Sequence, residues 1–342
     1  MSEIPSTQKA WIEERRGSPA ESLRLRTDWP VPTTLKPGEV LIKVQACGLN
    51  PAGYKIMGLF PNFLRGRPLP SGMDFSGVVV DANGTEYSNR LCKSTKQGTL
   101  SEYVRLPTSH IVPRPSTITP LAAAGLATVY LTAYTALVEL AQVEAGQTVF
   151  VYGGSSGVGL AAIQTAKARG ARVISSASGK NEAFVRGIGA DEFIDYTKEP
   201  IHKHLLAHPP SPKFNVIFDA IGISDPSLYT SSSAYLAPNG VFVSSGPFPK
   251  DASAPELWNL AKTVAAISTP RWLGGTPRRW TVVTDLYSRE KLEAVHALVA
   301  QGLLNPPIDS VFEFKDVVPG YERQMTKRAT GKIIVKIDPS VD

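Results

Sequence analysis

Residues 148–180 constrain the fold of this chain more than any other stretch: TVFVYGGSSGVGLAAIQTAKARGARVISSASGK. Thr148–Tyr152 is a short β-branched and aromatic run, typical of a buried parallel strand. Glycines then crowd into one turn, the alanine-rich run 160–168 predicts a helix, and Arg172–Ser176 begins a second strand. Such a turn lets the backbone approach a pyrophosphate at a helix N-terminus, so the pattern predicts a dinucleotide site and hydride-transfer chemistry.

The predicted phosphate-binding turn departs from the dinucleotide fingerprint at one position. Aligned on its last glycine, G-x-G-x-x-G falls on Gly154, Ser156 and Gly159, so that serine replaces the middle glycine. The alternative is a glycine-rich turn in an α/β protein that binds no nucleotide, but the order strand, turn, helix, strand favours the nucleotide site. The residues expected to bind the cofactor here are Gly154, Ser155, Ser156, Gly157, Val158 and Gly159.

The end of the second predicted strand favours NADP(H) over NAD. An NAD site has Asp or Glu there to bind the ribose 2′-hydroxyl. This chain instead reads Ala177, Ser178, Gly179, Lys180. A serine hydroxyl and a lysine ammonium suit a 2′-phosphate, which a carboxylate would repel. The alternative for Lys180 is a solvated loop charge.

Composition limits the class of protein. The 342 residues are 42% hydrophobic and 19% charged, and the net charge of +6 is spread along the chain without a basic stripe. We therefore expect no nucleic-acid partner. No apolar run is long enough to cross a bilayer, and the N-terminus has early acids and no apolar core, so it is not a secretory signal. We expect a cytoplasmic protein without a membrane partner.

Cysteine and histidine give few candidates for a metal site. Cys47 and Cys92 are isolated and form no CxxC pair, which excludes a four-cysteine zinc site. Cys47 lies in a strand-like run and is expected in the core. In IHKHLLAH the spacing can put His204 and His208 on one helical face; a metal site is possible there, and a polar surface segment is the favoured alternative.

The order of predicted elements indicates two domains. Residues 39–49, 75–81 and 101–107 read as strands, with turns at Pro37–Gly38 and Asn83–Gly84. From about Leu121 the chain becomes an alanine-rich helix and then alternates strand and helix. Further strands are predicted within 188–196, 216–222, 240–246 and 332–338, and a helix at 288–302. The strand at the C-terminus predicts that the first domain is discontinuous.

Several motifs resemble one family in their order and spacing. They are PGEVLIKVQACGLNPAGYK, GMDFSGVVV, GTLSEYV, LTAYTALVEL, GGSSGVG, GADEFIDY and ATGKIIVKI. With them the chain resembles the medium-chain dehydrogenase/reductase superfamily, and within it the zinc-free quinone oxidoreductase and enoyl reductase branch. The resemblance implies an α/β protein, usually a homodimer. It has a GroES-like β-domain (1–123 and 287–342) and a Rossmann domain with a doubly wound parallel sheet (124–286).

The resemblance also implies roles for residues of the first domain. Asn50 of the GLNP motif is expected to line the nicotinamide and substrate site, and Lys55 to lie near the substrate carbonyl. Lys55 could polarise that oxygen and donate a proton, or be a surface charge. Tyr54 could be the proton donor or a packing aromatic.

In the second domain the resemblance carries over to four positions. Thr132 matches a threonine that contacts the nicotinamide carboxamide. Tyr196 and Lys180 match residues that hold the 2′-phosphate. Gly246 falls in a loop that passes the nicotinamide ring.

The chain departs from the family pattern at several positions. Where zinc-dependent relatives have a cysteine and a histidine ligand, this chain has Asn50 and Met73, so we expect no catalytic zinc. Gly53 replaces a motif aspartate, and Phe60 stands where a tyrosine is often the proton donor. The segment 80–100 is short and lacks a recognisable Gly-Asp-x-Val strand, which indicates either a trimmed β-domain or a more open active-site rim.

Together these features predict an NADPH-dependent, zinc-independent reductase of α,β-unsaturated carbonyls or quinones, with a small-molecule enone, quinone or enoyl thioester as substrate. One alternative is an enoyl-thioester reductase; Arg271, Arg278 and Arg279 could then meet phosphates of the carrier, or form a solvated basic loop. The other is a non-catalytic NADPH-binding protein, which the changes at Gly53 and Phe60 keep open.

Overall fold

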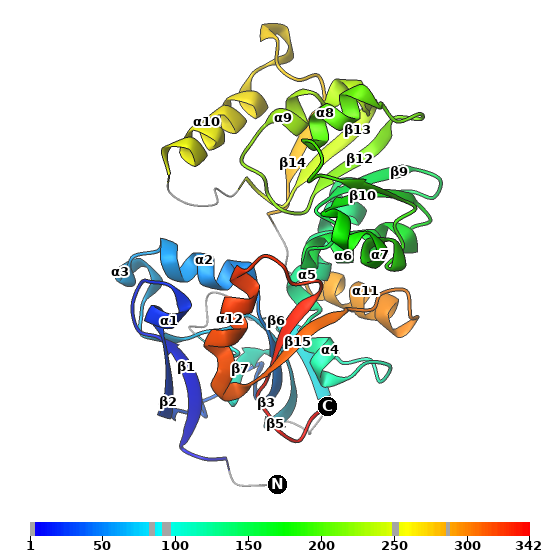
Figure 1. Cartoon of the computed structure of the whole chain (residues 1–342). Coiled ribbons are helices and arrows are strands. Elements are labelled where there is room, and N and C mark those ends of the chain that lie inside the picture. Colours follow the sequence, from blue (N-terminus) through cyan, green and yellow to red (C-terminus); the bar gives the residue numbers. More distant parts are fainter. Residues whose placement is uncertain (1–3, 82–85, 91–96, 248–252, 285–287) are drawn as a thin grey trace. The chain divides into compact units, whose positions relative to one another are not determined.

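The chain leaves its first unit after Val129 and returns to it at Tyr287 (Figure 1). Unit 1 comprises Met1–Val129 and Tyr287–Asp342, and unit 2 comprises Tyr130–Leu286. This computed structural model describes residues 4–81, 86–90, 97–247, 253–284 and 288–342.

Unit 1 is built on two sheets. The larger has the order β15-β16-β3-β5-β6-β8, with β7 also paired to β3, and the smaller has the order β2-β1-β4. The strands are β1 (Thr7–Glu13), β2 (Leu23–Pro30), β3 (Glu39–Gly48), β4 (Leu69–Pro70), β5 (Asp74–Asp81), β6 (Glu86–Arg90), β7 (Tyr103–Pro107), β8 (Val112–Pro113), β15 (Ile308–Glu313) and β16 (Lys332–Lys336). The helices are α1 (Pro19–Ser22), α2 (Pro51–Leu59), α3 (Asn62–Arg65), α4 (Pro120–Ala124), α11 (Arg289–Ala300) and α12 (Val317–Met325).

The core of unit 1 joins segments from both ends of the chain. In β7, Val104 and Leu106 are fully buried while their neighbours are partly exposed, the period of two expected of a strand. The C-terminal strand β16 pairs antiparallel with β3 and buries Val335 in the same apolar cluster. Met57 of α2 and Tyr321 of α12 complete this cluster, so the two helices are fixed on the sheet.

Unit 2 is a six-stranded parallel sheet of order β11-β10-β9-β12-β13-β14. Numbered from its own first strand this is 3-2-1-4-5-6, the order of a doubly wound dinucleotide-binding fold. The strands are β9 (Thr148–Tyr152), β10 (Arg172–Ala177), β11 (Glu192–Asp195), β12 (Phe214–Asp219), β13 (Leu236–Ser244) and β14 (Arg279–Val282). The helices are α5 (Ala127–Tyr134, which begins in unit 1), the π-helix Thr135–Leu140, α6 (Gly157–Ala168), α7 (Glu182–Gly187), α8 (Ile201–Ala207), α9 (Ser227–Thr230) and α10 (Ala254–Ser268).

The fold class predicted from the sequence is confirmed, and most predicted elements are present. The predicted strand 240–246 begins earlier, at Leu236, because a bulge separates two stretches of pairing with β12: Phe214 pairs with Leu236, and Val216 with Val241. Pro238 and Gly240 lie in the bulged stretch, and such residues hide a strand from pattern analysis. Helix α10 was not predicted. Its apolar residues do not share one buried face, since Leu257, Trp258 and Val264 are exposed.

The short segment 80–100 is described in part. Strand β6 within it pairs antiparallel with β5 and with β8, so this part of the sheet is retained. The predicted turn at Asn83–Gly84 and the cysteine Cys92 lie outside the described residues. Within the described ranges, none of the helices has both the length and the apolar character needed to span a bilayer.

We predict that protonation of His296 destabilises unit 1 in mild acid. His296 of α11 is 5% exposed, and burial lowers the pKa of its imidazole to about 4. The unfolded chain binds this proton near pH 6.5, so the stabilisation is complete above that pH and is lost as pH falls towards 4. The loss should approach about 3 kcal/mol.

Urea denaturation between pH 7.5 and 4 checks this. His296→Gln, which cannot be protonated, should flatten the pH dependence. A wild-type slope retained in His296→Gln would contradict the prediction.

Candidate functional site

The glycine turn predicted to bind phosphate links β9 to α6 in unit 2. Gly153 has φ +84°, and a Cβ there would collide with the side chain of Ile221. A Cβ on Gly154 would meet the Ser175 hydroxyl, and a Cβ on Gly159 would meet the Gly153 carbonyl. Close approach therefore requires glycine at these three positions. The turn presents bare backbone, which is what a pyrophosphate requires.

Ser156, which replaces the middle glycine of the fingerprint, is the N-cap of α6. Its backbone is extended, its Oγ accepts a hydrogen bond from the Gly159 amide at 3.0 Å, and its hydroxyl donates to the Gly153 carbonyl at 2.8 Å. Serine is a preferred N-cap, so the departure has a local cause. The first amides of this 12-residue helix, from Gly157 and Val158 onwards, lie at the positive end of its dipole. Together with Ser155 in the turn, this arrangement fits a dinucleotide phosphate.

The residues predicted to select the cofactor follow β10 and β11. Ser178 precedes the short turn Gly179–Asn181, and its hydroxyl accepts a hydrogen bond from the Asn181 side-chain Nδ2 at 3.2 Å. Lys180 lies in this turn and is exposed. Tyr196 comes directly after β11 and is 44% exposed. Because β10 and β11 are neighbouring parallel strands, these residues gather at one edge of the sheet.

Sequence reasoning missed a carboxylate at this edge. Asp195, the last residue of β11, pairs in register with Ala177, the last residue of β10. Its side chain accepts hydrogen bonds from the Thr197 amide at 2.9 Å and hydroxyl at 2.7 Å, and it lies where a side chain on Gly179 would be. These bonds lower the pKa of Asp195, so it is ionised at neutral pH. An anion thus stands beside the predicted 2′-phosphate position, contributed by the adjacent strand.

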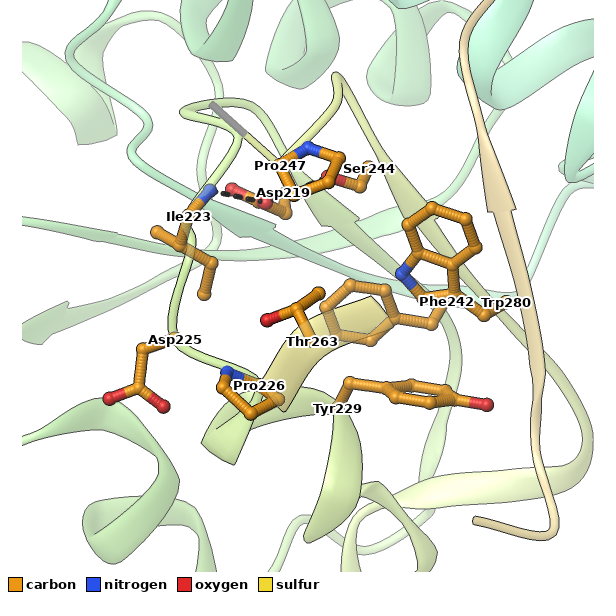
Figure 2. A pocket seen from close by; sticks show the side chains of 10 residues that line it. All are labelled: Asp219, Ile223, Asp225, Pro226, Tyr229, Phe242, Ser244, Pro247, Thr263 and Trp280. Carbon is orange, nitrogen blue, oxygen red and sulfur yellow. Dashed lines mark hydrogen bonds between the residues drawn. The ribbon is translucent and has the colours of Figure 1, made fainter. Parts of the chain in front are cut away.

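A second missed residue, Asp219, holds the loops that follow β12 and β13 (Figure 2). Its buried carboxylate accepts hydrogen bonds from the backbone amides of three successive residues, Ile221, Gly222 and Ile223, at 2.9–3.1 Å. The Ser244 hydroxyl donates a fourth at 2.9 Å. Burial raises the pKa of Asp219, while these bonds oppose the shift. Four donors match the lone pairs of an ionised carboxylate, and a protonated one could not accept them all.

Gly246 is connected to the same carboxylate through Ser244. The Gly246 amide donates to the Ser244 hydroxyl at 3.1 Å, and Gly246 itself has φ +120°. The loop predicted to pass the nicotinamide is therefore anchored at its first residues. Thr132, the other predicted nicotinamide contact, is buried in α5, three residues before the helix changes from α to π at Thr135.

A small pocket beside Asp219 is too small for the substrate. Aromatic side chains of Tyr229, Phe242 and Trp280 line it together with polar residues (Figure 2). Its volume of about 10 Å³ is close to the least that holds one water molecule. An enone or a quinone does not fit there.

In unit 1, Asn50 belongs to a buried polar network. Its Nδ2 donates to the Asp74 carboxylate at 2.8 Å, and its Oδ1 accepts from the Lys332 ammonium at 2.7 Å. Because a carboxylate only accepts and an ammonium only donates, these partners fix the orientation of the amide. Lys332 and Asp74 form a buried ion pair at 3.5 Å, and the Thr128 hydroxyl also donates to Asp74 at 2.6 Å.

Asn50 is 4% exposed, and both ends of its amide are bonded within unit 1. Although Asn50 precedes α2, its side chain makes no capping bond to that helix, since the network occupies it. The contact of Asn50 with a nicotinamide stays a prediction, and it would involve only the small exposed part of this residue.

Lys55 and Tyr54 lie on α2 but differ in environment. Tyr54 is half-buried and packs against the apolar core of unit 1, and burial raises the pKa of its hydroxyl. Lys55 is solvent-exposed. Surrounding protein atoms and, second, the Lys327 ammonium lower the pKa of Lys55. The roles predicted for Lys55 and Tyr54 toward a substrate stay predictions.

Packing against Tyr321 explains why glycine stands at position 53. A Cβ at this position would lie 2.8 Å from the hydroxyl of Tyr321, whose side chain is 1% exposed in the core. An aspartate at the motif position would therefore displace a buried ring. Phe60 is the C-cap of α2 and is 40% exposed, and its carbonyl accepts a hydrogen bond from the Arg67 guanidinium at 2.8 Å.

The positions that correspond to zinc ligands do not offer a zinc donor set. An amide and a thioether, from Asn50 and the half-buried Met73, are poor substitutes for an imidazole and a thiolate. The Asn50 oxygen already accepts from an ammonium, and that cation pairs with the neighbouring Asp74. A dication in this place would have to displace Lys332.

Comparisons with known proteins agree with this architecture. The alcohol dehydrogenase GroES-like domain family matches residues 36–116, and the zinc-binding dehydrogenase family matches residues 188–335. The chain is 33% identical to a medium chain reductase of an Acremonium species over 98% of this chain and all of that protein. It is 34% identical to a trans-enoyl reductase of Aspergillus terreus, over 98% of each. Its structure is similar to that of the quinone oxidoreductase from Coxiella burnetii, with a TM-score of 0.79, 27% identity and coverage of 97% and 100%.

The chain belongs to the medium-chain dehydrogenase/reductase superfamily and is quinone oxidoreductase-like. Relatives named enoyl reductases and a structural neighbour named a quinone oxidoreductase identify it as an oxidoreductase. The family indicates a nicotinamide cofactor, and the glycine turn of unit 2 fits one.

We predict that Lys332→Met disrupts the network around Asn50. The substitution leaves the buried Asp74 carboxylate without its cation, and breaking a buried pair costs about 3–5 kcal/mol. Thermal and urea denaturation should show a large loss of stability.

Lys336→Met is the matched control, because Lys336 lies on the same strand and pairs with the exposed Asp342. Its effect should be within about 1 kcal/mol. Adding Asp74→Asn to Lys332→Met should recover part of the loss. Equal losses in the two single variants would contradict the prediction.

Proposed function

We propose that this protein is an NADPH-dependent, zinc-independent reductase that adds hydride to a carbon–carbon double bond conjugated with a carbonyl. The observation that carries the proposal is the turn at residues 153–159, whose glycines and capped helix suit a dinucleotide phosphate. The unsuitable zinc donor set at Asn50 and Met73 disfavours oxidation of an alcohol through a metal alkoxide. An enoyl carbonyl accepts hydride without a metal if its oxygen is stabilised.

The preference for NADPH rests on the exposed ammonium of Lys180 and the hydroxyls of Ser178 and Tyr196. Asp195 opposes it, since its charge would repel a 2′-phosphate. However, that carboxylate accepts hydrogen bonds from Thr197 and lies against Gly179. Lys180, in contrast, is exposed to solvent.

We predict that Lys180→Ala raises the KM for NADPH about tenfold and leaves the KM for NADH unchanged, because only NADPH carries the 2′-phosphate. Initial rates with each cofactor measure this. Lys203→Ala, at another exposed lysine of unit 2, should change neither value. A parallel loss for both cofactors would remove Lys180 from 2′-phosphate recognition.

Within the reaction, the bound dihydronicotinamide supplies the hydride. As hydride adds at the β-carbon, negative charge moves to the carbonyl oxygen, and a proton must reach the α-carbon or the oxygen. In this proposal the Lys55 ammonium hydrogen-bonds to that oxygen. Its lowered pKa makes proton donation easier than from an ordinary lysine.

We predict that Lys55→Ala lowers kcat about a hundredfold while the affinity for NADPH, measured by fluorescence, stays the same. Lys55→Arg keeps the charge but gives up no proton at neutral pH, so it separates electrostatic stabilisation from proton donation. Lys36→Ala, at an exposed lysine of unit 1, is the control. Unaltered turnover in Lys55→Ala would exclude the lysine from the mechanism.

The relatives' names favour an enoyl substrate, since several are trans-enoyl reductases. A quinone is the second candidate, favoured by the structural similarity to a quinone oxidoreductase. For a carrier-bound thioester, Arg278 is a poor phosphate ligand. Its guanidinium donates to the carbonyls of Leu236, Pro277 and Ser233. Arg271 and Arg279 are exposed.

The test is NADPH oxidation with a quinone, a short enone, a long enal and a crotonyl thioester, with NADH as control and with a chelator in parallel. Preferred turnover of the enoyl compounds with NADPH, unaffected by the chelator, supports the proposal. NADPH binding without any turnover would instead indicate a non-catalytic binding protein. Loss of turnover with the chelator would overturn zinc independence.

A further inference from the structure

A group of side chains that could bind a metal lies in unit 2, outside the residues proposed to bind the cofactor. Glu199 belongs to the loop between β11 and α8, His204 lies on α8, and His208 is its C-cap. The three side chains are half-buried or exposed, so an ion can reach them from solvent. Nothing in the proposed reductase chemistry uses them.

The helix holds the two imidazoles on one face. The His208 amide donates to the His204 carbonyl at 2.8 Å, so the helical turn continues to His208. The ring centroids are 4.9 Å apart and tilted by 33°. Histidines four residues apart on a helix are the arrangement by which many zinc sites provide two nitrogen ligands.

The carboxylate of Glu199 lies beside the imidazole of His204. Its Oε1 lies 2.8 Å from Nδ1 of His204. One ligand atom from each of the three residues can be chosen so that all lie within 4.8 Å of one another. In a tetrahedral zinc site with bonds of about 2.0–2.1 Å, ligand atoms are about 3.3 Å apart. Rotation of these side chains, none of which is fully buried, can bring the ligand atoms to this spacing.

We propose that Glu199, His204 and His208 form a binding site for a divalent transition-metal ion of the zinc type, with a fourth position left to water. Two imidazoles and one carboxylate are a donor set that zinc accepts, whereas magnesium and calcium prefer oxygen ligands throughout. The exposed cations Lys198 and Lys203 flank the site in sequence, so we expect weaker binding than at a buried structural site.

The ion would tie the loop after β11 to the end of α8. That loop begins with Tyr196, and Asp195 anchors its first turn through Thr197. Metal binding is thus expected to stabilise unit 2 at the sheet edge where the predicted adenosine-phosphate residues lie. The alternative role for these residues is the existing hydrogen bond between Glu199 and His204 alone, without a metal ion.

Zinc titration of the full chain, freed of metal and monitored by competition with a chromogenic chelator, tests the site. Wild type should bind one equivalent reversibly, and zinc should raise its thermal midpoint. His204→Ala and His208→Ala should each lower the affinity about tenfold or more. Alanine suits a helix, so these variants should fold.

His202→Ala is the matched control: the residue is a histidine of the same helix outside the cluster, and its substitution should leave zinc affinity unchanged. Glu199→Gln keeps the shape but removes the charge, and should weaken binding. No saturable binding, affinity retained in His208→Ala, or an equal loss in His202→Ala would overturn the proposal. None of these readouts depends on turnover, so failure of the reductase proposal would not affect them.

Discussion

The candidate cofactor site depends on one buried carboxylate, that of Asp219. It is held at the end of β12 by four neutral donors. Three are successive amides, which fold the next loop back so that Ile221 packs over Gly153 in the phosphate turn. The fourth is Ser244, which in turn orients the Gly246 amide. A single anion therefore fixes the loops after β12 and β13, and through Ile221 it also positions an apolar side chain against the turn after β9.

Each unit contains a buried carboxylate, and the groups that stabilise its charge differ between the two units. Asp219 keeps its charge through backbone amides, whereas Asp74 has a cation, Lys332, that comes from the far end of the chain. The first solution is local, because all four donors lie within 25 residues of the carboxylate. The second joins β5 to the C-terminal strand β16, so the stability of unit 1 depends on the chain returning to it.

Local patterns in the sequence predicted the parallel sheet and the glycine turn because strands and turns are encoded by neighbouring residues. The serine at position 156 could also have been recognised as an N-cap from the helix that follows it. The bulge that lengthens β13 could not, since Pro238 and Gly240 interrupt the apolar run. The network of Asn50 was equally hidden: its partner Lys332 is 282 residues away, and no local pattern connects them.

The residues that distinguish NADP(H) from NAD cannot be identified from the end of one strand alone. The absence of an acid after β10 favoured NADPH, but parallel pairing brings Asp195 from β11 to the same edge. Asp195 and Lys180 thus lie at the same sheet edge, and their opposite charges would have opposite effects on a 2′-phosphate. The carboxylate is already occupied by Thr197, while the ammonium extends into solvent. The proposed preference for NADPH therefore requires that the Lys180 ammonium lie closer to the 2′-phosphate than the Asp195 carboxylate does.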